Sequence, residues 1–305
     1  MEQHNITTAT ATVTVIFVAT KNTPGLHNLT KSLDKLGYAY MRVGAGQKWG
    51  GWRHRMGMYI EVCKASPPES VLALIDADDV LPVRRPADML NSFLSFSCDV
   101  VVSTECECVA QTCHHVGNYW KLHHKVHSPR IYVCAGGMIG RARALAELWQ
   151  ALLDSGHSDD QYALGEYVNN NPTRVVLDHT NAIFYNPPVP FRNIDPLFKF
   201  EEDGTIKNIE QGGHKCTPYF VHFQGNFLSA AISRVIFDSP TNDRLLYDNL
   251  ARKLIGADAL PYFSDSLNGR LIVRGIFWGI VATVLVLIVA ASVAAIRRNR
   301  HTNST

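Results

Sequence analysis

The sequence of 305 residues is 46% hydrophobic and 18% charged, with a formal net charge of +2. A charged fraction below the average of about 25%, together with 10% aromatic residues, excludes a disordered chain. Because 29 basic side chains are balanced by 27 acidic ones, the composition also excludes a dedicated nucleic-acid-binding protein, which would carry a strong basic excess.

Taken in chain order, apolar residues recur alternately at strand spacing and at helix spacing. Strands are predicted at 13–19, 38–43, 71–75 and 100–103, and helices at 26–36, 51–65, 86–94 and 142–153. The last helix carries Leu145, Leu148, Trp149 and Leu152 on one stripe, which is typical of a helix packed against a core. This alternation predicts an α/β fold with a mostly parallel sheet of the nucleotide-binding type.

A long apolar run lies near the C-terminal end of the sequence. Residues 276–296 are 21 consecutive residues without a charge, which as a helix span about 31 Å, close to the thickness of a bilayer core. Trp278 lies near one end, and Arg297, Arg298 and Arg300 follow the other. We therefore expect a polar segment at 1–11, a globular domain at 12–264, a stalk at 265–274, one transmembrane helix at 275–296 and a basic tail at 297–305.

Two rules give opposite orientations for this expected single-pass membrane protein. Three arginines after the run against Arg270 and Arg274 before it favour a cytosolic tail, with the domain in the lumen of the endoplasmic reticulum or Golgi, or at the cell surface. The sequences Asn5-Ile6-Thr7 and Asn28-Leu29-Thr30 would then be usable glycosylation sites. The lack of a predicted N-terminal signal peptide instead supports a tail-anchored protein with a cytosolic domain. Of these two orientations, we expect the lumenal one.

The spacing of the cysteines does not indicate a zinc ribbon or a redox site. There are seven of them, an odd number, and no CxxC pair. Free buried thiols and a disulfide framework both remain open, with free thiols favoured.

An acidic cluster directly follows one predicted strand. The strand at 71–75 runs into Asp76-Ala77-Asp78-Asp79. Ligands of open α/β sheets bind beyond the carboxyl ends of the strands, and clustered carboxylates repel one another unless a cation neutralises them. The cluster therefore indicates a site for Mg²⁺ or Mn²⁺ of the kind that holds a nucleotide-sugar diphosphate. An acidic turn that caps a following helix is the structural alternative.

Several motifs occur together in one order along the chain. They are VAT at 18–20, GQKWGGW at 46–52, IDADDVL at 75–81, AGGMIG at 135–140, SDDQ at 158–161, LDH at 177–179 and VHFQGN at 221–226. In order and spacing they resemble the glycosyltransferase domain of the procollagen lysyl hydroxylases, which is related to the collagen glycosyltransferases. The resemblance spans roughly residues 13–226 and leaves no room for the hydroxylase portion of that family.

This resemblance implies a GT-A-like, Rossmann-related domain that uses a UDP-sugar and Mn²⁺. By residue, it implies metal ligation by Asp76, Asp79 and His222, donor binding by Val18, Ala19, Thr20, Lys48, Asp76, Ala77, Asp78, Gly225 and Asn226, and catalysis by Asp159 and Asp160. A divalent ion would neutralise the charge of the departing diphosphate. Mn²⁺ accepts both carboxylate oxygen and imidazole nitrogen, and a carboxylate near the sugar assists an oxocarbenium-like centre or an acceptor hydroxyl. For Asp159 and Asp160, a helix N-terminus is the alternative.

The chain also departs from the family pattern. The family has His-Gly-Asn-Gly followed by a lysine where this sequence has His222-Phe223-Gln224-Gly225-Asn226, and it has Asn-Ser where this sequence has Cys134-Ala135. The loop at 105–127 lacks the tryptophan-rich sequence of the family. Its histidines and cysteines suit either a variable acceptor loop or a zinc site of His123 and His127 with Cys108 and Cys113, the loop being favoured.

The sequence therefore predicts a membrane-anchored transferase that moves a hexose, glucose or galactose, from a UDP-sugar to a hydroxyl acceptor on a protein or glycan, hydroxylysine-linked acceptors among them. The alternative is a catalytically inactive relative that serves as a membrane-bound carbohydrate-binding, nucleotide-binding or adaptor protein.

Overall fold

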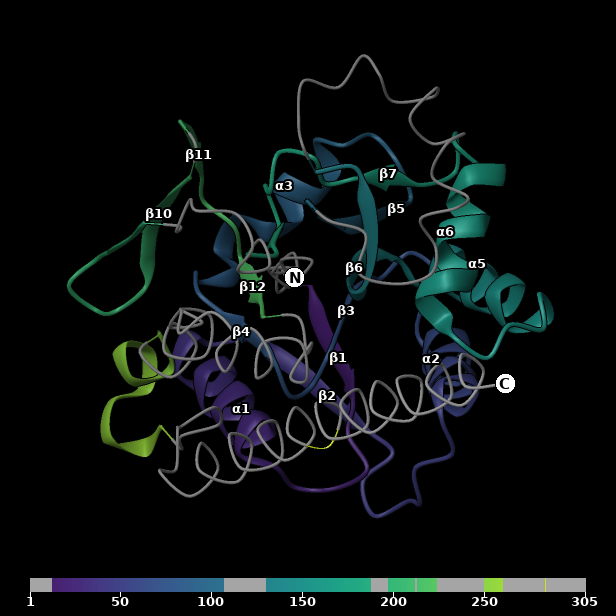
Figure 1. Ribbon diagram of the computed structural model, residues 1–305, viewed down its shortest axis with the longest axis horizontal. Coiled ribbons are helices and arrows are strands. Elements are labelled where there is room, and N and C mark those ends of the chain that lie inside the picture. Colours follow the sequence, from purple (N-terminus) through teal and green to yellow (C-terminus); the bar gives the residue numbers. More distant parts are fainter. Residues whose placement is uncertain are drawn as a thin grey trace, which may run out of the picture. The chain divides into compact units, whose positions relative to one another are not determined.

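A six-stranded mixed sheet forms the centre of the domain (Figure 1). The computed structural model describes residues 13–106, 130–187, 197–211, 213–223 and 250–259, together with Thr283. Contacts divide the chain into two compact units, and the elements below belong to the larger one, Met1–Gly225 with Asn242–Tyr262.

The strand order of this sheet is β2-β1-β3-β6-β5-β7. The strands are β1 (Thr14–Val18), β2 (Ala39–Val43), β3 (Val71–Ile75), β5 (Val100–Glu105), β6 (Tyr132–Arg141) and β7 (Val176–Leu177). Strand β1 pairs in parallel with β2 and β3, and β5 with β7, whereas β6 runs antiparallel between β3 and β5. The prediction of a mostly parallel sheet is thus confirmed, with β6 as the reversed strand that the sequence pattern did not reveal. Strand β6 contains Gly136, Gly137 and Gly140, and these glycines hide the alternating pattern by which strands are recognised.

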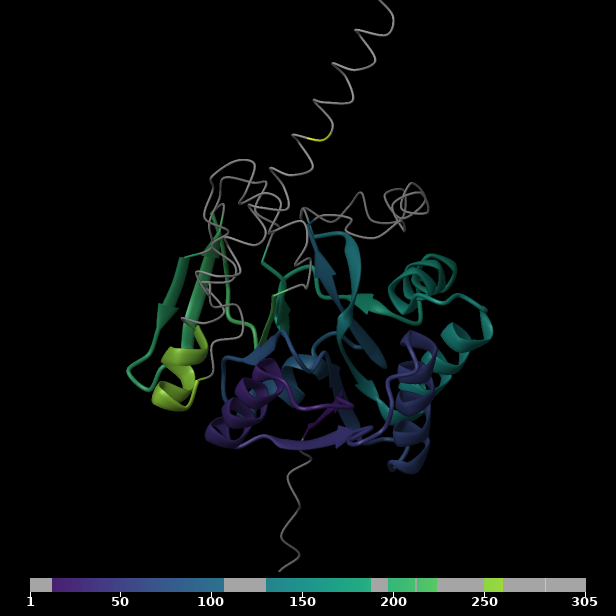
Figure 2. The ribbon, with the colours of Figure 1, turned by 60° about the horizontal axis from the view of Figure 1, so that its bottom comes forward.

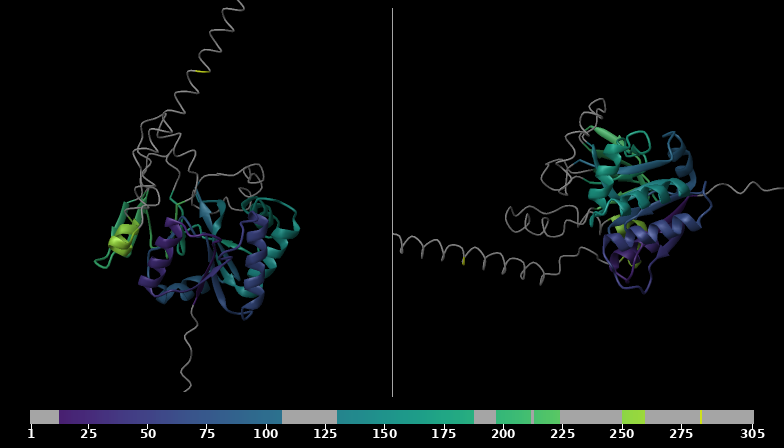
Figure 3. Two further views of the ribbon diagram at one scale, coloured as in Figure 1. Left: turned by 90° about the horizontal axis from the view of Figure 1, so that it is seen from below. Right: turned by 90° about the vertical axis from the view of Figure 1, so that its right-hand side faces the viewer.

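Helices cover both faces of the sheet (Figure 3). On one face α2 (Trp52–Ala65), α5 (Ala142–Asp154) and α6 (Asp160–Asn170) share an apolar core with Ile16 and Val18 of β1. On the other face α1 (Pro24–Leu36) and α3 (Met89–Leu94), which follows the short helix η1 (Pro86–Asp88), share a second core with Val15 and Phe17. Successive side chains of a strand point to opposite faces, so one apolar strand serves both cores. This layering confirms the predicted α/β class.

Two small sheets extend the domain. In the first, β12 (Phe220–His222) pairs antiparallel with β4 (Val80–Pro82) and parallel with β8 (Phe184–Tyr185). In the second, β9 (Leu197–Phe200), β10 (Ile206–Gln211) and β11 (His214–Cys216) form an antiparallel meander (Figure 2). Its turn at Gly204 lies against Lys253 in the 250–259 segment, which ends with η3 (Gly256–Asp258). The first sheet matters for the site because the pairing of β12 with β4 brings His222 next to Val80.

Some expectations lie outside the described residues. These are the apolar run (except Thr283), the stalk and tail, Asn5, and the histidines and cysteines of the 107–129 loop. Among the residues described, no helix is long and apolar enough to cross a membrane. Within the same residues, Cys63, Cys98, Cys134 and Cys216 are free thiols, as favoured.

The expected glycosylation site at Asn28 is wrong for the folded chain. Asn28 lies within α1 and is 0% exposed, and Thr30 donates its hydroxyl to the Leu26 carbonyl in the same helix. A glycan needs an exposed asparagine, and the buried face of a packed helix offers none.

A buried carboxylate organises the segment that leads into β8. Asp178 is fully buried and accepts hydrogen bonds of 2.8 Å from the backbone N–H groups of Ala182, Ile183 and Phe184. Burial raises the pKa of Asp178, and these N–H donors counter that effect. The carboxylate satisfies donors that would otherwise be buried without partners.

We predict that Asp178→Asn lowers the free energy of unfolding by about 2–3 kcal/mol, because an amide cannot accept all of these bonds and hydrogen bonds to charged groups are the stronger ones. Urea unfolding of the purified chain measures the change. The control is Asp154→Asn at the exposed end of α5, which should change the free energy by less than about 0.5 kcal/mol. Equal effects of the two substitutions would contradict this role for Asp178.

Candidate functional site

The acidic turn lies directly beyond β3, at the edge of the central sheet. Asp76 follows the last strand residue, and its backbone N–H donates to the Gly136 carbonyl of β6 at 3.0 Å. On the far side of the turn, a Cβ on Gly25 would lie 1.9 Å from the Asp78 carbonyl oxygen. Helix α1 therefore packs on the turn so closely that only glycine fits, and this contact fixes the turn's backbone.

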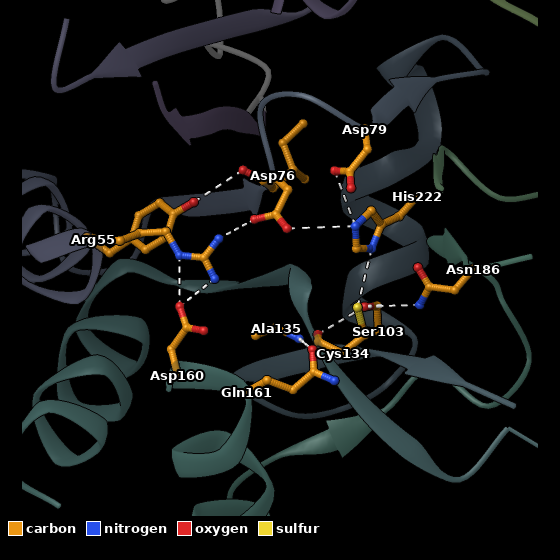
Figure 4. A network of polar contacts seen from close by, with 12 residues as sticks. Arg55, Asp76, Asp79, Ser103, Cys134, Ala135, Asp160, Gln161, Asn186 and His222 are labelled. Carbon is orange, nitrogen blue, oxygen red and sulfur yellow. Dashed lines mark hydrogen bonds and ion pairs between the residues drawn. The ribbon is translucent and has the colours of Figure 1, made fainter. Parts of the chain in front are cut away.

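Two aspartates of the turn meet a histidine from a distant strand (Figure 4). Register places His222 of β12 opposite Val80, and the Phe223 N–H donates to the Asp79 carbonyl at 2.8 Å. His222 Nε2 lies 3.4 Å from Asp79 Oδ1 and 3.7 Å from Asp76 Oδ2. One ligand atom from each of the three side chains lies within 4.8 Å of the others, so the set could hold a metal ion.

A glycine makes this meeting possible. A Cβ on Gly136 would lie 2.2 Å from His222 Cε1 and 2.9 Å from Asp76 Oδ2. No side chain larger than hydrogen fits between β6 and the imidazole. The first glycine of the Gly136-Gly137 pair therefore has a steric role at the site.

Burial and neighbouring charge both act on the histidine and on Asp79. Burial raises the pKa of Asp79, while His222 lowers it. For His222, burial alone would lower the pKa, but the adjacent Cys134 and Asp79 raise it well above its ordinary value. Burial also raises the pKa of Cys134 to about 12.

Arg55 joins the turn to helix α6. Its guanidinium is ion-paired with both Asp76 and Asp160, and its Nε donates to Asp160 Oδ2 at 2.8 Å (Figure 4). Although burial would lower the pKa of Arg55, Asp76 and Asp160 raise it, so the guanidinium stays charged. The exposed Trp52 ring lies 4.6 Å from the same guanidinium. Arg55 therefore holds the Asp76 and Asp160 carboxylates in place, because its guanidinium pairs with both of them.

The structure separates the two aspartates expected to be catalytic. Asp159 is exposed and is the N-cap of α6, because its Oδ1 accepts the Tyr162 N–H at 2.8 Å. Asp160 is buried and belongs to the Arg55 network, and burial raises its pKa while Arg55 lowers it. The capping alternative thus describes Asp159. Of these two aspartates, Asp160 is the one that belongs to the Arg55 network.

The expected donor-binding residues are placed unevenly. Val18 and Ala19 are buried at the carboxyl end of β1, and Thr20 follows, its carbonyl accepting the Gly46 N–H at 3.3 Å. Ala77 is buried in the acidic turn, and Asp78 accepts the Thr23 hydroxyl. Lys48 is exposed in the loop before α2, while Gly225 and Asn226 lie outside the described residues.

Sequence reasoning missed Arg55, Cys134 and Glu105. Arg55 precedes Tyr59 by four residues on the face of α2 that packs on the sheet. A lone arginine at core spacing requires a buried acidic partner, so its position could have been noticed. Glu105 ends the apolar strand β5, and burial raises its pKa to about 7, while hydrogen bonds from Cys134 and Gln161 lower it. Nothing local in the sequence indicates that these residues meet.

We predict that Arg55→Met destabilises the fold by about 3–5 kcal/mol, because it leaves Asp160 buried without its counter-charge. The double variant Arg55→Met/Asp160→Asn should recover part of that loss, since the uncompensated charge is removed. Urea unfolding measures both. Arg53→Met is the matched control from the exposed face of the same helix. Additive losses in the double variant would contradict this assignment.

The curated proteins that are similar to this chain are larger than it, and the similarity covers only a part of each one. The chain is 24% identical to the multifunctional procollagen lysine hydroxylase and glycosyltransferase LH3 of Rattus norvegicus, over 69% of this chain and 29% of that protein. It is 25% identical to procollagen-lysine,2-oxoglutarate 5-dioxygenase 1 of Mus musculus, over 56% of this chain and 25% of that protein. The chain thus spans less than a third of these relatives.

Among solved structures, a glycosyltransferase involved in the glycosylation of the major capsid of PBCV-1 matches 57% of this chain and 84% of its own length, at 13% identity and a TM-score of 0.39. The sequence model described as the PLOD GT domain matches residues 9–230, which include every residue of the Asp–Asp–His cluster and of the Arg55 network. This chain therefore belongs to the family of procollagen lysyl hydroxylase glycosyltransferase domains.

Proposed function

We propose that this protein transfers a hexose from a UDP-sugar to a hydroxyl acceptor with the help of Mn²⁺ in a GT-A-like domain. The observation that carries the proposal is the Asp76, Asp79 and His222 cluster beyond β3, with the buried Asp160 joined to it through Arg55. Membership of a glycosyltransferase family gives this cluster its chemical context.

The donor set fits a divalent ion of the Mn²⁺ type. Two ligands at right angles around an ion with bonds of about 2.1 Å are separated by about 3 Å. The distances of 3.4 Å and 3.7 Å from His222 Nε2 to the carboxylate oxygens need only a small contraction. Two oxygens with one imidazole nitrogen suit Mn²⁺ better than Mg²⁺ or Ca²⁺, which prefer oxygen alone.

The net charge of these side chains also supports the binding of a divalent cation. Asp76, Asp79 and Asp160 carry three negative charges and Arg55 carries one positive charge, so the cluster has a net charge of −2 when His222 is neutral. One divalent cation neutralises it. When bound, such an ion supplies a positive centre for the oxygens of the departing diphosphate.

The remaining steps belong to the chain's own residues. Arg55 pairs with Asp76 Oδ1 and leaves Oδ2 turned toward His222, which orients this carboxylate for metal ligation. Arg55 contacts Asp160 through Oδ2, and we assign Oδ1 to the sugar or to the acceptor hydroxyl. There a carboxylate would stabilise positive charge on the sugar ring or accept the hydroxyl proton.

The acceptor is proposed by analogy with the relatives. Because they are named as procollagen lysine hydroxylases with a glycosyltransferase, a hydroxyl on a protein or glycan, hydroxylysine-linked acceptors included, is the first class to test. Glucose and galactose are the donor sugars to compare. We also propose membrane attachment through the apolar run at 276–296, with the domain in the lumen, from the sequence pattern alone.

The first test is Mn²⁺-dependent release of UDP from UDP-glucose and UDP-galactose. Wild-type protein should release UDP in the presence of Mn²⁺ and not after removal of the metal with a chelator. Asp79→Asn should abolish the Mn²⁺-stimulated rate, because too little negative charge remains to hold the ion against water. His222→Ala removes no charge and should be milder.

The control for this test is Asp88→Asn, an exposed aspartate of η1 outside the cluster, which should keep the wild-type rate. A wild-type rate in Asp79→Asn would refute the metal assignment. UDP binding with no turnover on either donor would instead support the inactive, nucleotide-binding alternative.

The second test concerns Asp160. We predict that Asp160→Asn lowers turnover by about 100-fold or more, the usual contribution of a positioned acid–base group, while UDP and Mn²⁺ still bind. Steady-state rates and calorimetric titration with UDP measure these two effects. Asp159→Asn is the matched neighbour, and it should keep turnover because Asp159 serves the helix end. Lost UDP affinity with unchanged turnover in Asp160→Asn would place the residue in a purely structural role.

A further inference from the structure

An arginine side chain bridges the point where β1 and β2 separate. Strand β2 ends at Val43, whose carbonyl accepts the Ala19 N–H at 2.9 Å, and Gly44 then turns the chain with a φ of 81°. If the parallel ladder continued, the next donor to the Ala19 carbonyl would be a backbone N–H of β2. Arg42 Nε takes that place and donates to the Ala19 carbonyl at 2.8 Å. The side chain therefore satisfies a carbonyl that β2 no longer reaches.

The same guanidinium holds the far end of the loop that follows β1. This loop, residues 19–23, leads into α1, and Arg42 Nη1 donates to Asn22 Oδ1 at 2.7 Å. Both partners of the guanidinium are neutral groups, a backbone carbonyl and a side-chain amide. Its planar fork donates to Ala19 and Asn22 together, which the single ammonium of a lysine would not reproduce. Arg42 thus fixes the distance between the two ends of the loop.

The loop is also joined to the acidic turn. The Thr23 hydroxyl donates to the Asp78 carboxylate and accepts the Leu26 N–H at 3.0 Å, so Thr23 caps α1 and links it to the turn. The 19–23 loop is therefore anchored twice, to β2 through Arg42 and to the acidic turn through Thr23.

Sheet topology places this loop at the border of the expected ligand crevice. Strand β1 lies between β2 and β3 (Figure 1). The connection from β1 to β2 passes through α1 on one face, and the connection from β2 to β3 passes through α2 on the other face. Ligands of open α/β sheets bind where such connections diverge, beyond the carboxyl ends of the strands. A nucleotide bound there would meet the 19–23 loop on the β1 side and the Asp–Asp–His cluster on the β3 side.

We propose that Arg42 is a positioning residue that holds the 19–23 loop in the conformation that binds the nucleoside part of the UDP-sugar. This inference rests on the proposed function and deepens it, because Arg42 lies in none of the sequence motifs that carry the family resemblance. A loop that is already ordered loses less conformational entropy when its ligand binds. Without the guanidinium, the nucleotide itself would have to order the loop.

The proposal predicts a specific pattern of UDP affinities. We expect Arg42→Met to weaken UDP binding by about 10-fold or more, because two hydrogen bonds from a charged group are lost. Arg42→Lys should weaken it nearly as much, since the charge remains but the fork does not. Asn22→Ala removes one of the two bonds and should weaken binding by about threefold. Mn²⁺ binding without UDP should stay within about twofold of wild type, because neither partner of Arg42 belongs to the metal cluster.

Steady-state kinetics give a second readout. Contacts to the nucleoside are made equally in the ground state and in the transition state, so R42M should raise KM for the UDP-sugar and change kcat little. A merely structural role would instead lower kcat at constant KM, because less of the protein would be folded. That outcome would overturn the proposal.

The experiment is calorimetric titration of the full-length chain with UDP in the presence of Mn²⁺, for wild type, R42M, R42K and N22A. The matched control is Tyr40→Phe, because Tyr40 lies on the same face of β2 and its hydroxyl donates to Asp34 near the other end of α1. This variant should keep the wild-type affinity. Wild-type affinity in R42M would overturn the proposal, and so would wild-type affinity in R42K, because the positive charge alone would then suffice.

The readout separates this inference from the proposed function. If R42M binds UDP as tightly as wild type does, the positioning role fails while the transferase stands. If the affinities follow the predicted pattern but wild type transfers no hexose, the positioning role stands and the transferase fails. If wild type binds no UDP, both fail. Urea unfolding of each variant confirms that the titrated protein is folded.

Discussion

The structure of the site depends on how buried negative charge is compensated. Asp76, Asp79 and Asp160 gather at one edge of the sheet, and carboxylates in a low-dielectric interior repel one another and lose hydration. Arg55 offsets part of this cost by pairing with two of them from the buried face of α2. The remaining negative charge is concentrated where His222 reaches the turn. Because Arg55 neutralises only part of the negative charge of these carboxylates, the site would attract a divalent cation.

Close backbone approach is the second requirement. Gly25 allows α1 to touch the acidic turn, and Gly136 allows β6 to touch the His222 ring. Both glycines act through the space that they leave empty rather than through a contact that they make. An alanine at Gly136 would push the imidazole from the aspartates, so the geometry of the site is set by strand packing as much as by the ligands themselves.

Much of the architecture could be predicted from the sequence. The strand Val71–Ile75 and the helix at 142–153 have strong periodicity, and the acidic turn after an apolar strand indicates a ligand site in any open α/β sheet. The placement of Asp76 and Asp79 next to each other follows from their spacing alone. For Asp159, a catalytic role was the expectation and a helix cap the alternative, and the structure places this residue at the cap.

The remainder depends on contacts that no local pattern encodes. The antiparallel direction of β6 is set by its pairing with β3 and β5, and its glycines hide it as a strand. Arg55 finds Asp160 across a helix–helix contact, and Cys134 finds His222 only after β12 has paired with β4. His222 was predicted through family resemblance and not through its spacing, because a single histidine in an apolar strand has many ordinary explanations.

The long separation in sequence between the acidic turn and His222 has a consequence for the order of folding. During synthesis, the two aspartates leave the ribosome well before β12, so the site cannot close until the last strand of the small sheet has paired with β4. An ion that binds all three side chains would then act as a cross-link between an early and a late part of the chain. It would slow unfolding most for the segment at 214–223, and metal supply would set how long newly made protein remains open to degradation.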